Sequence, residues 1–193
     1  MITRLANPTD AARLAALHAT RISEGFLPTL GPRFLTRLYR RLILDPDSFA
    51  IVADEGGDVV GFAAAASDIG ALYRSFLLRD GVVASIGAAP ALLRSWRRVI
   101  ETLRYPEGSA DLPDAEILSV AVDATAGGRG VGTKVVTEAL SRLRDSGVSS
   151  AKVVVGADNE TALAMYRRCG FENAARIEVH GGRASEVLVW KAP

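Results

Sequence analysis

Four glycines stand within six residues in the stretch AGGRGVGTKVV, which covers residues 126–136. The apolar run ILSVAV precedes this stretch and a helical pattern follows it, so the glycines are predicted to form a strand-to-helix turn. Glycine allows backbone N–H groups to approach a ligand closely, and a helix N-terminus favours negative charge. The stretch therefore predicts a loop that binds phosphate.

Two well-known nucleotide loops match this stretch poorly. The triphosphate loop needs lysine directly after its last glycine, but Thr133 and Lys134 stand in the reverse order. The dinucleotide fingerprint fails at its third glycine, where Thr133 stands. A turn without a ligand is the other alternative, although each glycine in it costs backbone entropy. The interpretation we favour is that the amides of residues 128–133 bind a diphosphate without a metal, which suits coenzyme A.

Composition narrows the class of protein. The chain has 193 residues, a formal net charge of +1 and 49% hydrophobic residues, which indicates a globular protein rather than a nucleic-acid-binding one. One cysteine and two histidines, Cys169, His18 and His180, give little basis for a metal centre. No signal peptide or membrane-spanning run is recognisable, so we expect a cytoplasmic protein without membrane or nucleic-acid partners.

Alternating strand and helix patterns surround the glycine loop. The second half reads as strand, loop, helix, strand, helix and hairpin, at residues 115–123, 126–132, 133–147, 151–158, 159–171 and 175–192. Such a crossover unit implies two adjacent parallel strands. The first half predicts a strand, two helices and a hairpin, at residues 1–6, 8–23, 25–46 and 48–67. Residues 68–113 are predicted to form a helical insertion in a single domain of residues 1–193.

Two segments in this order resemble the general-control-type N-acetyltransferase (GNAT) superfamily. Its [Q/R]-x-x-G-x-[G/A] loop is matched by Gly130 and Gly132, with Gly127 in place of the usual glutamine or arginine and a basic residue, Arg129, inside the loop. Its N-x-x-A-x-x-x-Y-x-x-x-G-F segment is matched at every specified position, by Asn159, Ala162, Tyr166, Gly170 and Phe171. The match is close from Asp114 onward and holds only in outline before it.

The resemblance implies an α/β fold with a mixed, mostly antiparallel central sheet, a splayed parallel strand pair and flanking helices. It also implies an acetyl-CoA-dependent N-acetyltransferase that acts on a primary amine of a small molecule or peptide in a ternary complex, as a monomer or homodimer and without a metal. A non-catalytic acyl-CoA-binding module and a phosphotransferase are the rivals. The expected cofactor contacts are Val120, Ala121, Val122, Gly127, Gly128, Arg129, Gly130, Val131, Gly132, Thr133, Asn159 and Tyr166.

Acid and base roles follow from the same resemblance. Tyr166 stands at the family's acid position, with core packing as the alternative, and Asn159 either contacts pantetheine or only caps a helix. Glu116 opens the strand before the loop, where burial would raise its pKa and make it a base. A solvated strand end, with ordered water as the base, is the other interpretation of Glu116. His18 is expected on a helix surface, with a place in the acceptor groove as the alternative, and Cys169 is expected as a packing residue rather than a nucleophile.

Overall fold

The computed structural model describes residues 1–22, 27–72, 112–179 and 183–193, which form one seven-stranded sheet in the order β1-β2-β3-β4-β5-β7-β6. All neighbouring strands pair antiparallel except β4 and β5, which are parallel. The strands are β1 (Ile2–Leu5), β2 (Ser48–Glu55), β3 (Asp58–Ala66), β4 (Glu116–Val122), β5 (Ser150–Gly156), β6 (Glu172–Val179) and β7 (Arg183–Lys191). The predicted mixed sheet with one parallel pair is confirmed.

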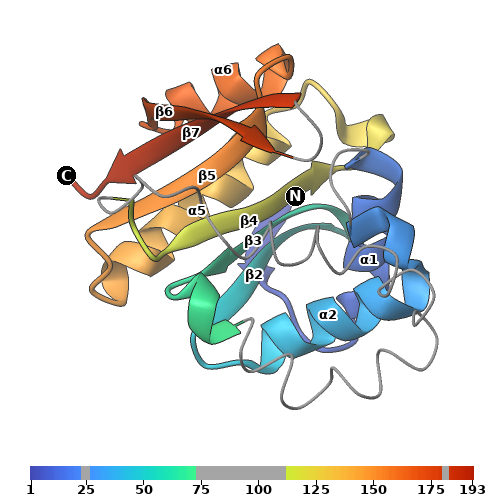
Figure 1. The fold of residues 1–193 in the computed structure, drawn as a ribbon. Helices are drawn as coiled ribbons and strands as arrows, with labels where there is room; N and C mark the ends of the chain where they lie inside the picture. Colours follow the sequence, from blue (N-terminus) through green and yellow to red (C-terminus); the bar gives the residue numbers. More distant parts are fainter. Residues whose placement is uncertain (23–26, 73–111, 180–182) are drawn as a thin grey trace.

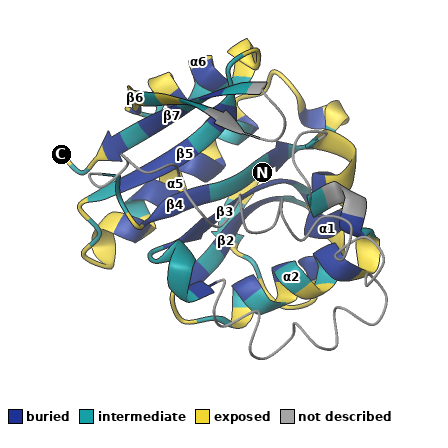
Figure 2. Cartoon of the chain, viewed as in Figure 1, coloured by how far each residue is buried: buried dark blue, intermediate teal, exposed yellow. Residues whose placement is uncertain are grey.

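Helices cover both faces of the sheet (Figure 1). On one face lie α1 (Ala11–Arg21) and α2 (Pro32–Leu44), and on the other lie α5 (Val131–Asp145) and α6 (Glu160–Arg168). Two short 3₁₀ turns, η1 (Leu27–Leu30) and η2 (Ala124–Ala126), precede α2 and α5. Each face has its own apolar cluster, and Figure 2 shows the strands buried between helices whose outer sides are exposed. We call the two sides the α1/α2 face and the α5/α6 face.

Most predicted elements are present, with shifted ends. The helix after the glycine loop begins at Val131 rather than Thr133, and the last hairpin begins at Glu172. Residues 73–111 of the predicted helical insertion, and the predicted turn at residues 181–182, lie outside the described residues. None of the helices within the described ranges is long and apolar enough to cross a membrane.

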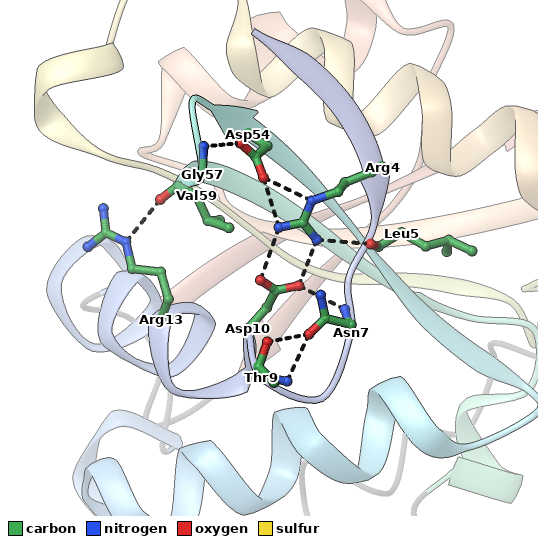
Figure 3. Close-up of polar contacts among 9 residues, drawn as sticks. All are labelled: Arg4, Leu5, Asn7, Thr9, Asp10, Arg13, Asp54, Gly57 and Val59. Carbon is green, nitrogen blue, oxygen red and sulfur yellow. Dashed lines mark hydrogen bonds and ion pairs between the residues drawn. The ribbon is translucent and has the colours of Figure 1, made fainter.

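A guanidinium between two carboxylates attaches the first strand to the rest of the fold (Figure 3). Arg4 donates hydrogen bonds of 2.8 and 3.1 Å to Asp10 and one of 2.9 Å to Asp54. Asp10 also accepts the Asn7 backbone N–H at 2.8 Å, and Asp54 accepts that of Gly57 at 2.7 Å. The Arg4 hydrogen bonds are the main cause that lowers the pKa of Asp10, which is 9% exposed. The Arg4 guanidinium therefore joins β1, which carries it, to Asp10 at the start of α1 and to Asp54 on β2.

Replacing Asp10 with asparagine should lower the free energy of unfolding by about 1–3 kcal/mol at neutral pH, since the amide keeps only one of the two acceptors that Arg4 uses and carries no negative charge. The folded-state pKa is depressed, so this stability is present above the unfolded-state value of about 3.9 and is lost as the pH falls below it. Urea unfolding of wild type and variant should thus differ near neutrality and converge in acid. Asp58→Asn, at the exposed first position of β3, is the control. Equal stabilities at neutral pH would contradict the assignment.

Candidate active site

The parallel strands β4 and β5 are paired only near their N-terminal ends. Their ladder contains one Cα pair, Glu116↔Lys152, next to a 2.9 Å hydrogen bond from the Lys152 N–H to the Ala115 carbonyl. By contrast, β5 pairs with β7 along its whole length, from Ser150 to Gly156. The rest of β4 therefore has an edge without ladder bonds to β5. We call this unpaired stretch between β4 and β5 the gap.

A β-bulge changes the direction of β4 where the two strands separate. On β3, Ala64 and Ala65 pair with Ser119 and Ile117, so Leu118 is the extra residue. Because of this insertion Leu118 and Ser119 both lie on the α1/α2 face, whereas the neighbouring Ile117 packs in the cluster under α5 and α6. Bulges redirect side chains and end regular pairing, and they are frequent beside active sites.

Beyond the bulge, alternate residues of β4 present their backbone groups to the gap. The Asp123 N–H donates to the Val60 carbonyl on β3 at 2.8 Å. In an antiparallel strand the backbone N–H and C=O groups of successive residues point to opposite sides. The backbone groups of Ala121 therefore also point to β3, while those of Val120 and Val122 point to the side of β5. Of the three predicted contacts on this strand, Val120 and Val122 are the ones able to bond a ligand in the gap through their main chain.

The glycine loop connects this edge of β4 to the start of α5. Gly128 and Gly130 have φ values of 73° and 75°, in the left-handed region that favours glycine. The first hydrogen bond of α5 runs from the Lys134 N–H to the Gly130 carbonyl at 3.1 Å. The N–H groups of residues 131–133 therefore have no acceptor within the helix. The Gly127 N–H is already bonded to the Ala124 carbonyl at 3.3 Å. The amides oriented to receive an anion therefore begin after Gly127.

Gly132 has a packing role as well. A Cβ added there would lie 2.7 Å from the Met165 Sδ on α6, so the missing side chain lets α5 and α6 approach closely. Arg129, the basic residue of the loop, pairs through both guanidinium nitrogens with the Glu55 carboxylate at the end of β2. Its side chain is about half exposed, at 52%. Arg129 thus connects the loop to the β2–β3 hairpin.

Tyr166 is buried on the α5/α6 face, with its ring edge-to-face against Phe171 at a centroid distance of 5.4 Å. Burial raises the pKa of its hydroxyl, and the nearby Cys169 and Glu116 raise it further. No hydrogen bond to this hydroxyl is present among the described residues. The structure therefore places a protonated phenol within electrostatic range of Glu116, the other predicted catalytic residue.

Glu116 is not at a solvated strand end, so that part of the alternative interpretation is wrong, while the choice between Glu116 and ordered water as the base stays a prediction. Glu116 is 8% exposed, and its Oε2 lies 3.7 Å from the Nζ of the buried Lys152. Lys152 also donates to the Pro113 carbonyl. The ammonium favours the ionised carboxylate, which opposes the effect of burial that the sequence suggested. Glu116 is thus one half of a buried ion pair at the point where β4 and β5 separate.

Three further sequence assignments can be compared with the structure. The Asn159 side chain accepts the Ala162 N–H at 3.1 Å, so Asn159 caps α6. Cys169 is half-buried, and burial raises the pKa of its thiol, as suits a packing residue better than a nucleophile. His18 is 4% exposed, so its expected surface position is wrong. Its burial is tolerated because Tyr39 supplies a hydrogen bond that sequence spacing does not reveal.

Arginines of α1 fix the far end of β4. Arg21 donates from Nε to the Val122 carbonyl at 3.0 Å, and Arg13 pairs with Asp123 at 2.7 Å. Asp123 also accepts the backbone N–H and the hydroxyl of Thr125, and these contacts, with the Arg13 bond, lower its pKa to about 2. The start of the glycine loop is therefore held from the α1/α2 face.

Comparison with known families agrees with this arrangement. A family model described as Acetyltransferase (GNAT) family matches residues 19–171. The chain belongs to the GNAT acetyltransferase family. The match includes β4, the glycine loop, α5, β5 and α6, which are the elements that form the gap and carry Tyr166.

Curated relatives of this GNAT chain include mycothiol acetyltransferases. The protein of Cellulomonas flavigena is 34% identical over 86 residues, which is 45% of this chain and 25% of that protein. The protein of Kytococcus sedentarius is 39% identical over 71 residues, which is 37% of this chain and 24% of that protein. In both alignments the matched part is about a quarter of the relative's length.

Solved structures share the fold at low sequence identity. The ribosomal-protein-S18-alanine N-acetyltransferase of Escherichia coli has a TM-score of 0.62 and 13% identity, covering 98% of this chain and 92% of that one. A putative acetyltransferase of Salmonella typhimurium, solved with its cofactor acetyl-CoA, has a TM-score of 0.65 and 16% identity, with the same coverages of 98% and 92%. These likenesses establish the GNAT fold and leave the acceptor open.

Sequence reasoning did not single out three residues that contact β4 or belong to it, which are Lys152, Tyr39 and Ser119. Lys152 had one signal, because it is the charged residue in the otherwise apolar strand AKVVVG. Tyr39 lies within the predicted helix of residues 25–46, and Ser119 lies within the apolar run ILSVAV, so neither had a signal of its own. Their shared position beside β4 depends on pairing between distant segments.

Proposed function

We propose that this chain binds acetyl-CoA between β4 and β5 and transfers the acetyl group directly to a primary amine. The observation that carries the proposal is the single-pair ladder between β4 and β5, which opens toward the glycine loop at the start of α5. The free edge of β4 suits the extended, amide-containing pantetheine arm. The amides of residues 128–133 suit its diphosphate, and no lysine or metal is needed for binding.

In this proposal Tyr166 supplies a proton and the Glu116 carboxylate takes one up. Tyr166, on the α5/α6 face, donates its proton to the leaving thiolate. Glu116 takes up the proton of the amine through ordered water, because its own carboxylate is held by Lys152. Backbone N–H groups beyond the bulge, such as that of Val120, polarise the acetyl carbonyl. The amine approaches from the α1/α2 face.

The rival from another class is a non-catalytic module that binds acyl-CoA on the same fold. Solved relatives acetylate amines as different as a ribosomal-protein alanine and, in the Vibrio cholerae and human chimera, spermidine. A binding module would retain the glycine loop and the gap but would release no CoA thiol in the presence of amines. Measuring turnover, rather than cofactor binding, therefore distinguishes an acetyltransferase from a non-catalytic binding module.

Calorimetric titration with acetyl-CoA, with and without Mg²⁺, tests the binding step. We expect binding with a Kd in the micromolar range that Mg²⁺ does not change, because backbone amides hold the diphosphate. A thiol-release assay with spermidine, glucosamine and an alanine-terminated peptide then tests transfer. Binding of MgATP in place of acetyl-CoA would overturn the proposal, and binding without turnover on any amine would favour the module.

A further inference from the structure

A chain of three polar side chains crosses the α1/α2 face and ends on β4. The His18 Nδ1 on α1 lies 2.6 Å from the Tyr39 hydroxyl on α2, which lies 2.9 Å from the Ser119 Oγ on β4. His18 and Tyr39 are 4% and 2% exposed, whereas Ser119 is only half-buried. Of the three groups, Ser119 is therefore the one that a molecule outside the core can reach.

The surroundings of this chain are apolar. Leu14, Leu17 and Leu35 belong to the same buried cluster, and the Tyr39 ring packs edge-to-face on Phe62 at 5.2 Å. The His18 Nε2 has no hydrogen-bond partner among the described residues. Leaving a buried polar atom unpaired is unfavourable, and apolar side chains would fill this space without that cost. The stability of the fold therefore does not explain why these three polar side chains are present.

The chemistry of the three groups sets the direction of their hydrogen bonds. Burial lowers the pKa of His18 to about 4 and raises that of Tyr39, so both stay neutral around pH 7. The imidazole nitrogen is the strongest acceptor of the three groups, so the Tyr39 O–H donates to it. The Tyr39 oxygen then accepts the Ser119 proton, and each bond polarises the next. The lone pairs of the Ser119 oxygen remain available to an incoming N–H donor.

Ser119 owes its position to the bulge in β4. If the strand continued through Leu118 without a bulge, regular alternation would place Ser119 on the α5/α6 face with Ile117. The bulge turns Ser119 to the α1/α2 face, next to the strand edge that has no ladder bonds to β5. Tyr166 lies on the opposite face.

We propose that the Ser119 hydroxyl accepts a hydrogen bond from the attacking amine and directs its lone pair at the acetyl carbon, with Tyr39 and His18 as positioning residues that hold the hydroxyl in this direction. The inference rests on the proposed function and deepens it. The nitrogen forms the new bond to the acetyl carbon as the carbon–sulfur bond breaks. Its surplus proton leaves through the water that serves Glu116, while the thiolate receives the proton of Tyr166.

The test compares Ser119→Ala, Tyr39→Phe and Ser119→Thr in the acetyl-transfer assay, with the fastest amine among spermidine, glucosamine and an alanine-terminated peptide. For Ser119→Ala we expect kcat/KM for the amine to fall by roughly 10- to 50-fold, the range of one lost hydrogen bond in a site. Tyr39→Phe should lower kcat/KM less. The double variant Ser119→Ala/Tyr39→Phe should have a kcat/KM only slightly below that of Ser119→Ala, because Tyr39 acts only through Ser119. Ser119→Thr keeps the hydroxyl and should restore most of the activity.

Calorimetry separates a direct role from a structural one. The Kd for acetyl-CoA should change by less than about twofold in all variants, since residues acting on the amine leave cofactor binding intact. Thr36→Ala is the matched control, because its hydroxyl also lies on α2 but bonds only the Pro32 carbonyl of that helix. If wild type transfers acetyl and Ser119→Ala matches it, this inference alone is overturned. If wild type binds acetyl-CoA but uses no amine, the proposed transfer fails, and this inference with it.

Discussion

Replacing Tyr166 with phenylalanine is expected to lower kcat for acetyl transfer by roughly 100-fold, the scale of one general-acid contribution. The substitution removes one oxygen and leaves the ring, so the edge-to-face contact with Phe171 is retained. No hydrogen bond of the described residues is lost with the hydroxyl, so folding should be little affected. The Kd for acetyl-CoA, measured by calorimetry, should stay within about twofold of wild type, because an acid acting on the leaving group contributes in the transition state and not in binding.

The pH dependence gives a second measure of the same role. Burial raises the pKa of Tyr166, so the phenol remains protonated at neutral and moderately alkaline pH. Ionisation of Tyr166 should therefore not reduce wild-type kcat below about pH 10, the ordinary tyrosine value. Thr36→Ala serves as a comparison, because it removes a hydroxyl that bonds only the Pro32 carbonyl within α2. An unchanged kcat in Tyr166→Phe would eliminate Tyr166 as the acid and leave it as a packing residue.

The parts of this fold that the sequence predicted depend on local patterns. The parallel pair followed from strand, loop, helix and strand in succession, since a crossover of that length forces parallel neighbours. The glycine loop was visible because its spacing is contiguous in the chain. Asn159 was predicted either to cap a helix or to contact pantetheine, and its side chain does cap α6. A cap joins residues three apart in the sequence, so a local pattern can predict it.

What the sequence could not predict depends on contacts between distant segments. The bulge at Leu118 exists only in the register between β3 and β4, and the apolar run ILSVAV gives no sign of it. His18 lies four residues after Leu14 and so shares its helix face, yet burial of an imidazole is acceptable only with the Tyr39 hydroxyl nearby. The buried partner of Glu116 comes from β5, so its ion pair was equally invisible.

Introducing a negative charge at Gly128 should remove most of the affinity for acetyl-CoA. Gly128 has a φ of +73°, and an added Cβ there would meet nothing within 4 Å, so the protein itself has room for a side chain. An aspartate at this position would face the proposed diphosphate across the loop. Two unit charges about 5 Å apart repel by about 3 kcal/mol at an effective dielectric constant of about 20, which corresponds to a loss of roughly 100-fold in Kd. Calorimetry with acetyl-CoA measures this change directly.

Gly128→Asn is the matched control for Gly128→Asp. Asparagine and aspartate have nearly the same size and both tolerate the left-handed conformation, so strain and bulk are common to the two variants. The difference between their Kd values therefore reports the charge alone. It should diminish as salt rises from about 0.05 to about 1 M, because the screening length shortens to about 3 Å. Equal Kd values for the two variants at low salt would mean that no phosphate lies at this loop, and the main-chain anion site proposed for the chain would be wrong.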